Sequence, residues 1–265
     1  MNLEKLTSSL ENYKKELKML DFVYNRPIFI EKMIKLRQFL ANIKDEKLIN
    51  NFFQSIFFKE NKEFFRTQNN YYMRAIETQE AIWILTSNNN LDNIWELLKV
   101  EQIKERYDNK AKTFLDIDFS KIKNFVMIWT WALPETVLYL SEKTDIENII
   151  CIDDNFEAVF LAWEMILKLG IKNVTLKHTN LLNFNFQNVD LIYIPWFTFK
   201  KNELIQRIIN SWPKKVQIII NTPDKLESLL YDNVNISLFP ELNFSEISKD
   251  NAKYRNDIFL LWKFK

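Results

Sequence analysis

The spacing of hydrophobic residues differs between the two halves of the chain. In the first half, leucine and aromatic residues recur every three or four positions with lysine and glutamate between them, as over residues 3–20. Helical spacing also follows Pro27, which suits a helix first turn, and predicts a buried face of Ile30, Ile34, Phe39 and Ile43. Further helices are expected near 45–58, 70–86 and 91–107. Strand-like alternation does not occur here, so residues 1–117 are predicted to form an all-α domain.

From residue 123 onward, short apolar runs alternate with helical segments. The runs are typical of buried parallel strands and lie at 124–129, 148–153, 173–178, 189–194 and 216–221. The helical segments lie at 134–143, 155–170, 201–212 and 224–233. Residues 244–248 and 257–264 are expected to close the sheet as an antiparallel hairpin. The predicted fold is α/β: an N-terminal all-α helical domain, then over residues 118–265 a class I methyltransferase-like Rossmann sheet with a C-terminal hairpin.

Composition narrows the function classes. Lys and Arg total 36 against 35 Asp and Glu, so no net field attracts nucleic acid or an anionic membrane. One cysteine (Cys151) and one histidine (His178) exclude a disulfide framework and a Cys/His zinc cluster. The segment 1–17 has no apolar signal core, and no run approaches the roughly 18 apolar residues of a membrane span. A reduced, cytoplasmic protein without a protein-bound metal, a nucleic-acid partner or a membrane is expected.

Glycine is the compositional outlier. Average usage predicts roughly 18 or 19 glycines in a chain of this length, whereas the sequence has one, Gly170, alongside eight tryptophans. Taken by itself, this deficit argues against any binding loop that depends on glycine.

The ligand of a doubly wound sheet lies at the carboxyl ends of the strands, beside the point where the strand order reverses. The loop after the first strand is 129–134, and the second strand ends at Asp153, followed by Asp154. Asp153 lies 22 positions after Trp131, close to the spacing of about 20 expected for an acid that accepts ribose hydroxyls. The alternative is a solvated acid that caps the helix at 155. Asn180, after the third strand, is a candidate contact for an adenine amine through its amide oxygen.

These segments resemble the nicotianamine synthase-like family. The family's Gly-Ser-Gly-Pro-Leu-Pro loop corresponds in frame to Trp-Thr-Trp-Ala-Leu-Pro at 129–134, and Leu133-Pro134 is the most specific part. The family's acidic strand end followed by Glu-Ala matches 153–158, and its Leu-Tyr segment matches LESLLYDN at 226–233. The resemblance covers about 118–265, and a preceding helical domain is also a family trait. Two departures stand out: both loop glycines are Trp, and Asn180 replaces an acid.

The resemblance implies an enzyme that moves the aminobutyrate (3-amino-3-carboxypropyl) group of S-adenosylmethionine to a small amine or amino acid. Methylthioadenosine is released, and the product is a small metallophore that itself binds the metal. The implied cofactor-binding residues are Trp129, Thr130, Trp131, Leu133, Pro134, Asp153, Asp154, Asn180, Leu181 and Pro195. Two alternatives remain: a small-molecule methyltransferase, and a degenerate, non-catalytic Rossmann protein whose helical domain binds a partner.

Transfer to an amine needs a neutral nitrogen and therefore a nearby base. Family members place a Tyr and a Glu in a helix that covers the active site, here 69–85. Tyr72, Ile76 and Glu80 follow one another at intervals of four, so Glu80 falls in line with the apolar face, where an acid is a functional candidate. Glu80 and Tyr72 are the predicted catalytic residues, with Glu77 as a further candidate. The alternative places Glu80 at the edge of the stripe, where it is solvated or paired with Arg74 or with a lysine elsewhere in the chain.

Tryptophan is a poor residue for a cofactor loop, because the turn needs backbone angles that glycine adopts easily and the backbone must approach the ligand closely. Either the cofactor has been lost or these positions are not tryptophan in the organism. Some genetic codes read the codon UGA as tryptophan and others as glycine. Translating the gene with the wrong code would therefore write tryptophan at every position where the organism inserts glycine at UGA. Glycine would suit four positions: Trp129, Trp131, Trp196 and Trp212. Trp83, Trp95 and Trp163 lie in predicted helices and argue weakly against the idea, and Trp262 is neutral.

Three other features have structural interpretations. His178 ends a strand and is expected to hydrogen-bond a loop, and Cys151 is expected to be an inert residue of a buried strand. The Phe-rich stretch 52–65 is interpreted as interdomain core or as the face of a homodimer.

Overall fold

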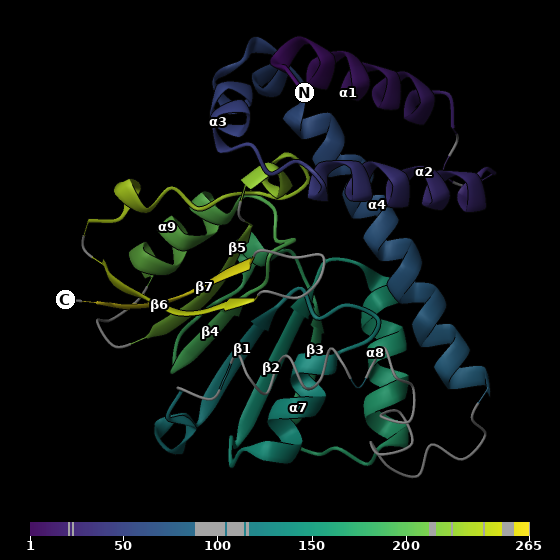
Figure 1. The fold of residues 1–265 in the computed structure, drawn as a ribbon. Coiled ribbons are helices and arrows are strands. Elements are labelled where there is room, and N and C mark those ends of the chain that lie inside the picture. Colours follow the sequence, from purple (N-terminus) through teal and green to yellow (C-terminus); the bar gives the residue numbers. More distant parts are fainter. Residues whose placement is uncertain are drawn as a thin grey trace.

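The computed structural model describes residues 1–20, 22, 24–87, 104, 114, 117–211, 216–223, 225–240, 242–250 and 257–264. Nearly all of the expected helix at 91–107 lies outside these residues, as do Trp95 and Trp212. The helices of the first part lie above a single twisted sheet (Figure 1). Among the described residues, the structure holds no helix with the length and hydropathy that a membrane crossing requires.

The first part consists of α1 (Leu3–Lys18), α2 (Arg26–Ala41), α3 (Glu46–Gln54) and α4 (Ile56–Ser87). The side chains of Asn2 and Asp45 cap α1 and α3 by accepting hydrogen bonds from backbone N–H groups of the first turn. Pro27 lies in the first turn of α2, as predicted. Leu6, Leu10 and Leu17 of α1 are buried, which confirms the helical spacing at the start of the chain.

Two expectations about these helices were wrong. The buried residues of α2 are Phe29, Met33, Leu36 and Leu40, whereas Ile34 is 38% exposed. Apolar residues occur on both sides of α2, so contact with α1 and α4 decides which side is buried. In addition, the spacing predicts separate helices at 45–58 and 70–86. In the structure the first ends before the extended Ser55, and α4 is a single helix of 32 residues that begins after it.

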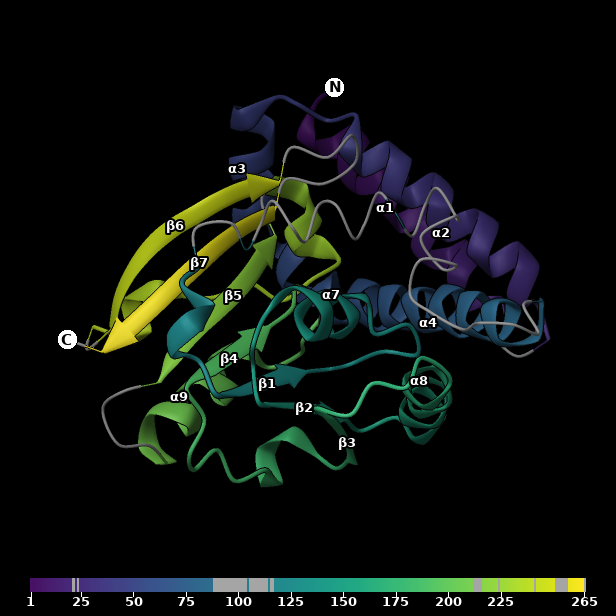
Figure 2. The same ribbon diagram turned by 90° about the horizontal axis from the view of Figure 1, so that it is seen from below.

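The sheet contains β1 (Asn124–Ile128), β2 (Asn148–Asp153), β3 (Val174–His178), β4 (Leu191–Ile194), β5 (Gln217–Pro223), β6 (Leu242–Asp250) and β7 (Asp257–Phe264). Their order is β3-β2-β1-β4-β5-β7-β6, with β1 to β5 parallel and β7 antiparallel to both β5 and β6 (Figure 2). The order reverses between β1 and β4, which places a ligand crevice at their carboxyl ends. The predicted α/β class with a methyltransferase-like Rossmann sheet is confirmed.

The connecting helices are α7 (Glu135–Lys143), α8 (Phe156–Lys168) and α9 (Lys201–Ser211), close to the predicted ranges. The predicted helix at 224–233 is wrong: a short 3₁₀ helix, η3 (Lys225–Leu229), stands there. The carbonyl oxygens of Ser228 and Leu230 accept hydrogen bonds from the side chains of Arg66 and Asn69 of α4, not from the backbone of a continuing helix. A long-range contact with α4 therefore overrides the local helical pattern.

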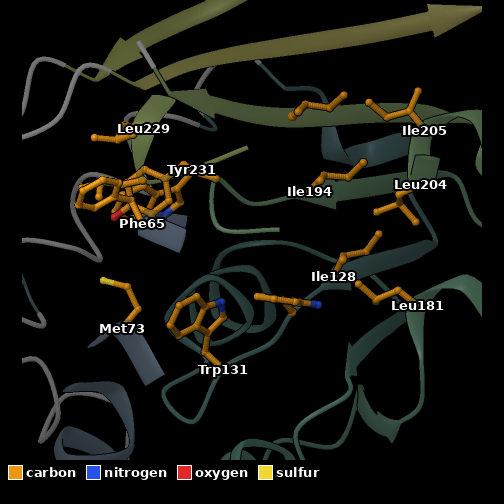
Figure 3. Packing of buried hydrophobic residues seen from close by; sticks show 14 of the residues in the cluster. Phe65, Met73, Ile128, Trp131, Leu181, Ile194, Leu204, Ile205, Leu229 and Tyr231 are labelled. Atoms are coloured by element: carbon orange, nitrogen blue, oxygen red, sulfur yellow. The ribbon is translucent and has the colours of Figure 1, made fainter. Parts of the chain in front are cut away.

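The helical part and the sheet share one core. A single cluster of buried residues includes Leu6, Phe29 and Phe52 from the helices together with Val126 and Ile192 from the sheet. Figure 3 shows Met73 of α4 facing Trp131, which follows β1. Phe52 and Phe65, from the Phe-rich stretch, are wholly buried, which favours the core interpretation of that stretch. The boundary at 117/118 stays a prediction.

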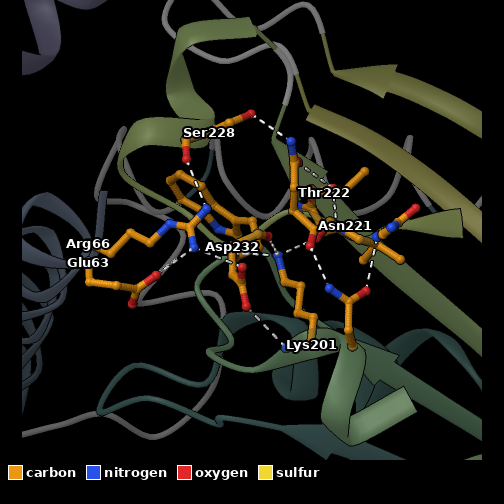
Figure 4. Close-up of polar contacts among 12 residues, drawn as sticks. Glu63, Arg66, Lys201, Asn221, Thr222, Ser228 and Asp232 are labelled. Carbon is orange, nitrogen blue, oxygen red and sulfur yellow. Dashed lines mark hydrogen bonds and ion pairs between the residues drawn. The ribbon is translucent and has the colours of Figure 1, made fainter. Parts of the chain in front are cut away.

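Polar contacts join α4 to the sheet part and also connect elements within that part (Figure 4). Arg66 of α4 pairs with Asp232 at 3.0 Å, and Lys201 is wholly buried. The Lys201 Nζ donates to the carbonyl oxygens of Trp196, Asn221 and Asp232 at 2.6, 3.0 and 2.8 Å. A buried ammonium with three acceptors has its hydrogen-bonding capacity filled, so Lys201 ties together the ends of β4 and β5 and the segment after η3.

Candidate functional site

A small cavity lies where the carboxyl ends of β1 and β2 meet α4. Its lining residues are Asn70, Arg74, Glu77 and Thr78 of α4, Trp129, Trp131 and Ala132 after β1, and Asp153, Asn155 and Ala158. This is the position at which a doubly wound sheet binds its ligand. Three of the predicted cofactor-binding residues, Trp129, Trp131 and Asp153, come together here.

The backbone of the loop after β1 has the conformation that glycine favours. Trp129 has φ 55° and Trp131 has φ 67°, both in the left-handed region. A bulky residue there is a genuine outlier, and the left-handed conformation costs roughly 1–2 kcal/mol per residue. These are the two positions at which the resembling family carries glycine.

The two indoles fill the space that a ligand would need. Each tryptophan is only 6% exposed, and neither indole Nε1 has a hydrogen-bond partner in the part of the chain that the structure describes. The Trp131 ring centroid lies 3.6 Å from that of Phe197, closer than the roughly 4.5–7 Å of favourable aromatic pairs. The remaining cavity is ≈ 20 Å³, about the size of one water, whereas ligand sites measure roughly 300–1,000 Å³. S-adenosylmethionine therefore does not fit this cavity with tryptophan at these positions.

Asp153 at the end of β2 holds this loop in place. Its Oδ2 accepts a hydrogen bond from Trp131 N at 3.1 Å, and its Oδ1 accepts one from Asn155 N at 2.9 Å. The carboxyl is 5% exposed, and Asn155, not Asp153, caps α8. The alternative of a solvated helix cap is therefore wrong. Burial raises the pKa of Asp153 to about 6, against the opposing effect of the two backbone hydrogen bonds.

This raised pKa predicts a pH dependence of stability. The unfolded carboxyl has a pKa near 3.8, so between roughly pH 4 and 6 the folded protein binds more protons than the unfolded chain. The contribution of Asp153 to the free energy of unfolding should therefore fall as pH rises through this window, by about 2 kcal/mol. Urea unfolding of the protein and of Asp153→Asn at several pH values measures the difference between their free energies of unfolding. A difference that does not change between pH 4 and 6 contradicts the prediction.

The other predicted cofactor-binding residues are not among the residues that line the cavity. Thr130, Leu133 and Leu181 are buried, Pro134 immediately precedes α7, and the Pro195 carbonyl accepts from Thr198 N. The Asn180 side chain caps the 3₁₀ helix η2 (Leu181–Asn183) by accepting from Leu182 N at 2.9 Å. Asp154 is exposed and pairs with Arg74 at 3.2 Å. Their roles toward a ligand stay predictions.

On α4, the structure brings Glu77 to the cavity. Glu80 lies three residues further along the helix and Tyr72 five residues before Glu77, and neither is among the lining residues. Arg74, considered as a partner of Glu80, pairs with Asp154. Sequence reasoning missed Asn70 and Arg74, although the polar residues Asn70, Arg74 and Glu77 recur at i, i+4 and i+7, a spacing that places them on one helix face.

A second cavity of ≈ 650 Å³ adjoins the first and shares Asn70 and Arg74 with it. Phe199 lines this larger cavity, and its ring packs against Trp129 at 5.4 Å. The Arg74 guanidinium lies 5.6 Å from the same indole. Trp129 therefore lines the small cavity and contacts two residues that line the larger one.

The single histidine and cysteine have the structural roles that their positions predicted. His178 Nε2 donates to the Asp154 carbonyl at 3.1 Å. Cys151 is wholly buried, and burial raises the pKa of its thiol to about 12, which keeps it protonated and inert. Within the described part of the chain, no group of three acidic, histidine or cysteine side chains is placed to hold a metal ion.

Comparisons with solved structures show an extended likeness of fold. A structure of MtNAS, a nicotianamine synthase, in complex with MTA and tNA has a TM-score of 0.74 at 15% identity, covering 99% of this chain and 97% of that one. A glutamate-to-glutamine variant of MtNAS in complex with S-adenosylmethionine has a TM-score of 0.71 at 15% identity, covering 98% of each chain. No protein-family model matches the sequence, and no curated protein matches it. At this identity the likeness establishes the fold of both parts of the chain.

Proposed function

We propose that this protein is an S-adenosylmethionine-dependent transferase that moves the aminobutyrate group to a small amine and releases methylthioadenosine, as a step in making a metallophore. The observation that carries the proposal is the loop after β1, where two left-handed residues flank Thr130 and the Asp153 carboxylate accepts from the loop backbone. The extended likeness to a nicotianamine synthase crystallised with S-adenosylmethionine supports it.

The proposal includes glycine at positions 129 and 131 of the protein as the organism makes it, because the organism reads a UGA codon at each position as glycine. Glycine would relieve the left-handed strain at both positions and vacate the space of two indoles beside Asp153. Trp196, the next candidate, is buried in a strand-end turn against other aromatic rings. Trp83 and Trp163 are about half exposed on α4 and α8, and the structure gives no reason for glycine at either.

The reaction requires a neutral amine nitrogen to attack the carbon attached to the sulfonium. A carbon–nitrogen bond forms, the carbon–sulfur bond breaks, and its electron pair stays on sulfur as methylthioadenosine leaves. The ammonium product then loses a proton to a base. Glu80 and Tyr72 are proposed for the acceptor side on the resemblance, and Glu77 on its place in the cavity.

Product analysis separates the candidate reactions. The protein with glycine at 129 and 131 is incubated with S-adenosylmethionine and a panel of small amines and amino acids, and the products are separated by chromatography. Transfer of the aminobutyrate group releases methylthioadenosine, whereas methylation releases S-adenosylhomocysteine and contradicts the proposed reaction. A glycine protein that binds no S-adenosylmethionine supports the non-catalytic alternative.

A further inference from the structure

Arg37 of α2 holds its positive charge inside a cage of aromatic rings. The rings of Tyr72, Trp196 and Tyr231 lie 5.6–5.8 Å from its guanidinium carbon. Its NH1 donates to Asn69 Oδ1 at 3.0 Å and to the Tyr231 hydroxyl.

This guanidinium lacks the partner that an enclosed arginine usually has. Among the described residues no acidic side chain forms an ion pair with Arg37. Burial is the largest single influence on its pKa and lowers it, whereas Tyr231, and after it Glu227 and Tyr72, raise it, so that the pKa is raised on balance. Burial opposes the charged form. A desolvated cation bonded only to a hydroxyl and an amide can still form the bidentate hydrogen bonds that guanidinium makes to a carboxylate.

A continuous row of rings connects Arg37 with the loop after β1. Trp196 packs at 4.2 Å against Tyr231 and at 4.8 Å against Phe197. Phe197 in turn lies 3.6 Å from Trp131. Two of the residues in this row, Trp131 and Trp196, are candidates for glycine. Glycine at both would leave Tyr231 beside the guanidinium and Phe197 beside the loop that Asp153 holds, with the space of two indoles open between and around them.

We propose that Arg37 binds a carboxylate group in the active site, at the end of the row of rings away from Asp153, beside the rings of Tyr72 and Tyr231. This inference rests on the proposed function and on glycine at 129, 131 and 196. The carboxylate belongs either to the aminobutyrate group of S-adenosylmethionine or to the acceptor.

Calorimetric titration of the protein with glycine at all three positions tests this role. Methylthioadenosine lacks the carboxylate, so its affinity reports whether the pocket is folded. If Arg37 holds the donor carboxylate, Arg37→Met should weaken S-adenosylmethionine by at least roughly 10-fold and leave methylthioadenosine unchanged. If Arg37 holds the acceptor carboxylate, the variant should instead weaken L-alanine, and not ethylamine, in protein saturated with methylthioadenosine.

Three comparisons keep the test decisive. Lys35→Met, on the exposed side of the same helix, should change none of these affinities. Arg37→Lys keeps the positive charge but cannot form the two parallel hydrogen bonds of a guanidinium, so it should lose less affinity than Arg37→Met. If Arg37→Met does not fold, Arg37→Lys takes its place in the test. Equal weakening of methylthioadenosine, or no Arg37-dependent binding of either S-adenosylmethionine or L-alanine, overturns the inference. A parent protein that binds neither nucleoside overturns the proposed function instead.

Discussion

Replacing Trp129 and Trp131 by glycine is expected to create affinity for S-adenosylmethionine in a protein that otherwise has none. The two indoles leave a cavity of ≈ 20 Å³, and both backbones already have the angles that glycine prefers. Affinity should rise by at least roughly 100-fold, equivalent to about 2.8 kcal/mol of binding free energy. Isothermal titration calorimetry of the two proteins measures this change.

The double variant Trp83→Gly/Trp163→Gly is the matched control. These tryptophans are about half exposed on α4 and α8, away from the cavity lining. Their replacement should cost about 1 kcal/mol each in helix stability and give no binding. The loop variants should destabilise the protein by less than the roughly 3–5 kcal/mol usual for a buried tryptophan, because left-handed strain is relieved. A folded loop variant that does not bind S-adenosylmethionine contradicts the glycine hypothesis.

The second large effect is expected at the acidic residues of α4. In the protein with glycine at 129 and 131, turnover should fall by roughly 10²–10⁴-fold when the general base is changed to glutamine. Glu77→Gln and Glu80→Gln are compared directly, because Glu77 lines the cavity whereas the family resemblance favours Glu80. The affinity for S-adenosylmethionine should stay the same in either variant, since neither side chain is proposed to bind it. Initial rates of methylthioadenosine release provide the readout.

Glu60→Gln serves as the control for these variants, because Glu60 is an exposed residue on the same helix. It should retain full turnover. If both Glu77→Gln and Glu80→Gln also retain full turnover, neither acid is the base. Tyr72→Phe then becomes the remaining test of the acceptor side.

Most of the sheet could be predicted because buried parallel strands leave a strong local signal. The runs at 124–129 and 148–153 became β1 and β2 almost without change, and the position of Asp153 at the end of β2 followed directly. The frame of the loop at 129–134 also predicted where glycine-like backbone angles occur, since Trp129 and Trp131 are both left-handed. This second prediction came from the match to the family's glycine positions, because tryptophan by itself disfavours the left-handed region.

The parts that could not be predicted depend on contacts between distant segments. The segment 225–229 forms a 3₁₀ helix because α4 binds the carbonyl groups of Ser228 and Leu230. Arg37 reaches Tyr231 across 194 positions of sequence, and no local pattern distinguishes it from a surface arginine. The choice between Glu77 and Glu80 depends on how far α4 is rotated about its axis, which helical spacing does not determine to within one turn.

The identity of residues 129 and 131 in the natural protein decides whether the loop after β1 can form a binding site for S-adenosylmethionine. Peptide mass spectrometry of the protein isolated from the cells that make it, together with the codons of its gene, determines both positions. We expect UGA codons and glycine at 129 and 131. Tryptophan at both positions, encoded by UGG, would contradict it and leave a Rossmann protein whose ligand pocket is filled by its own side chains.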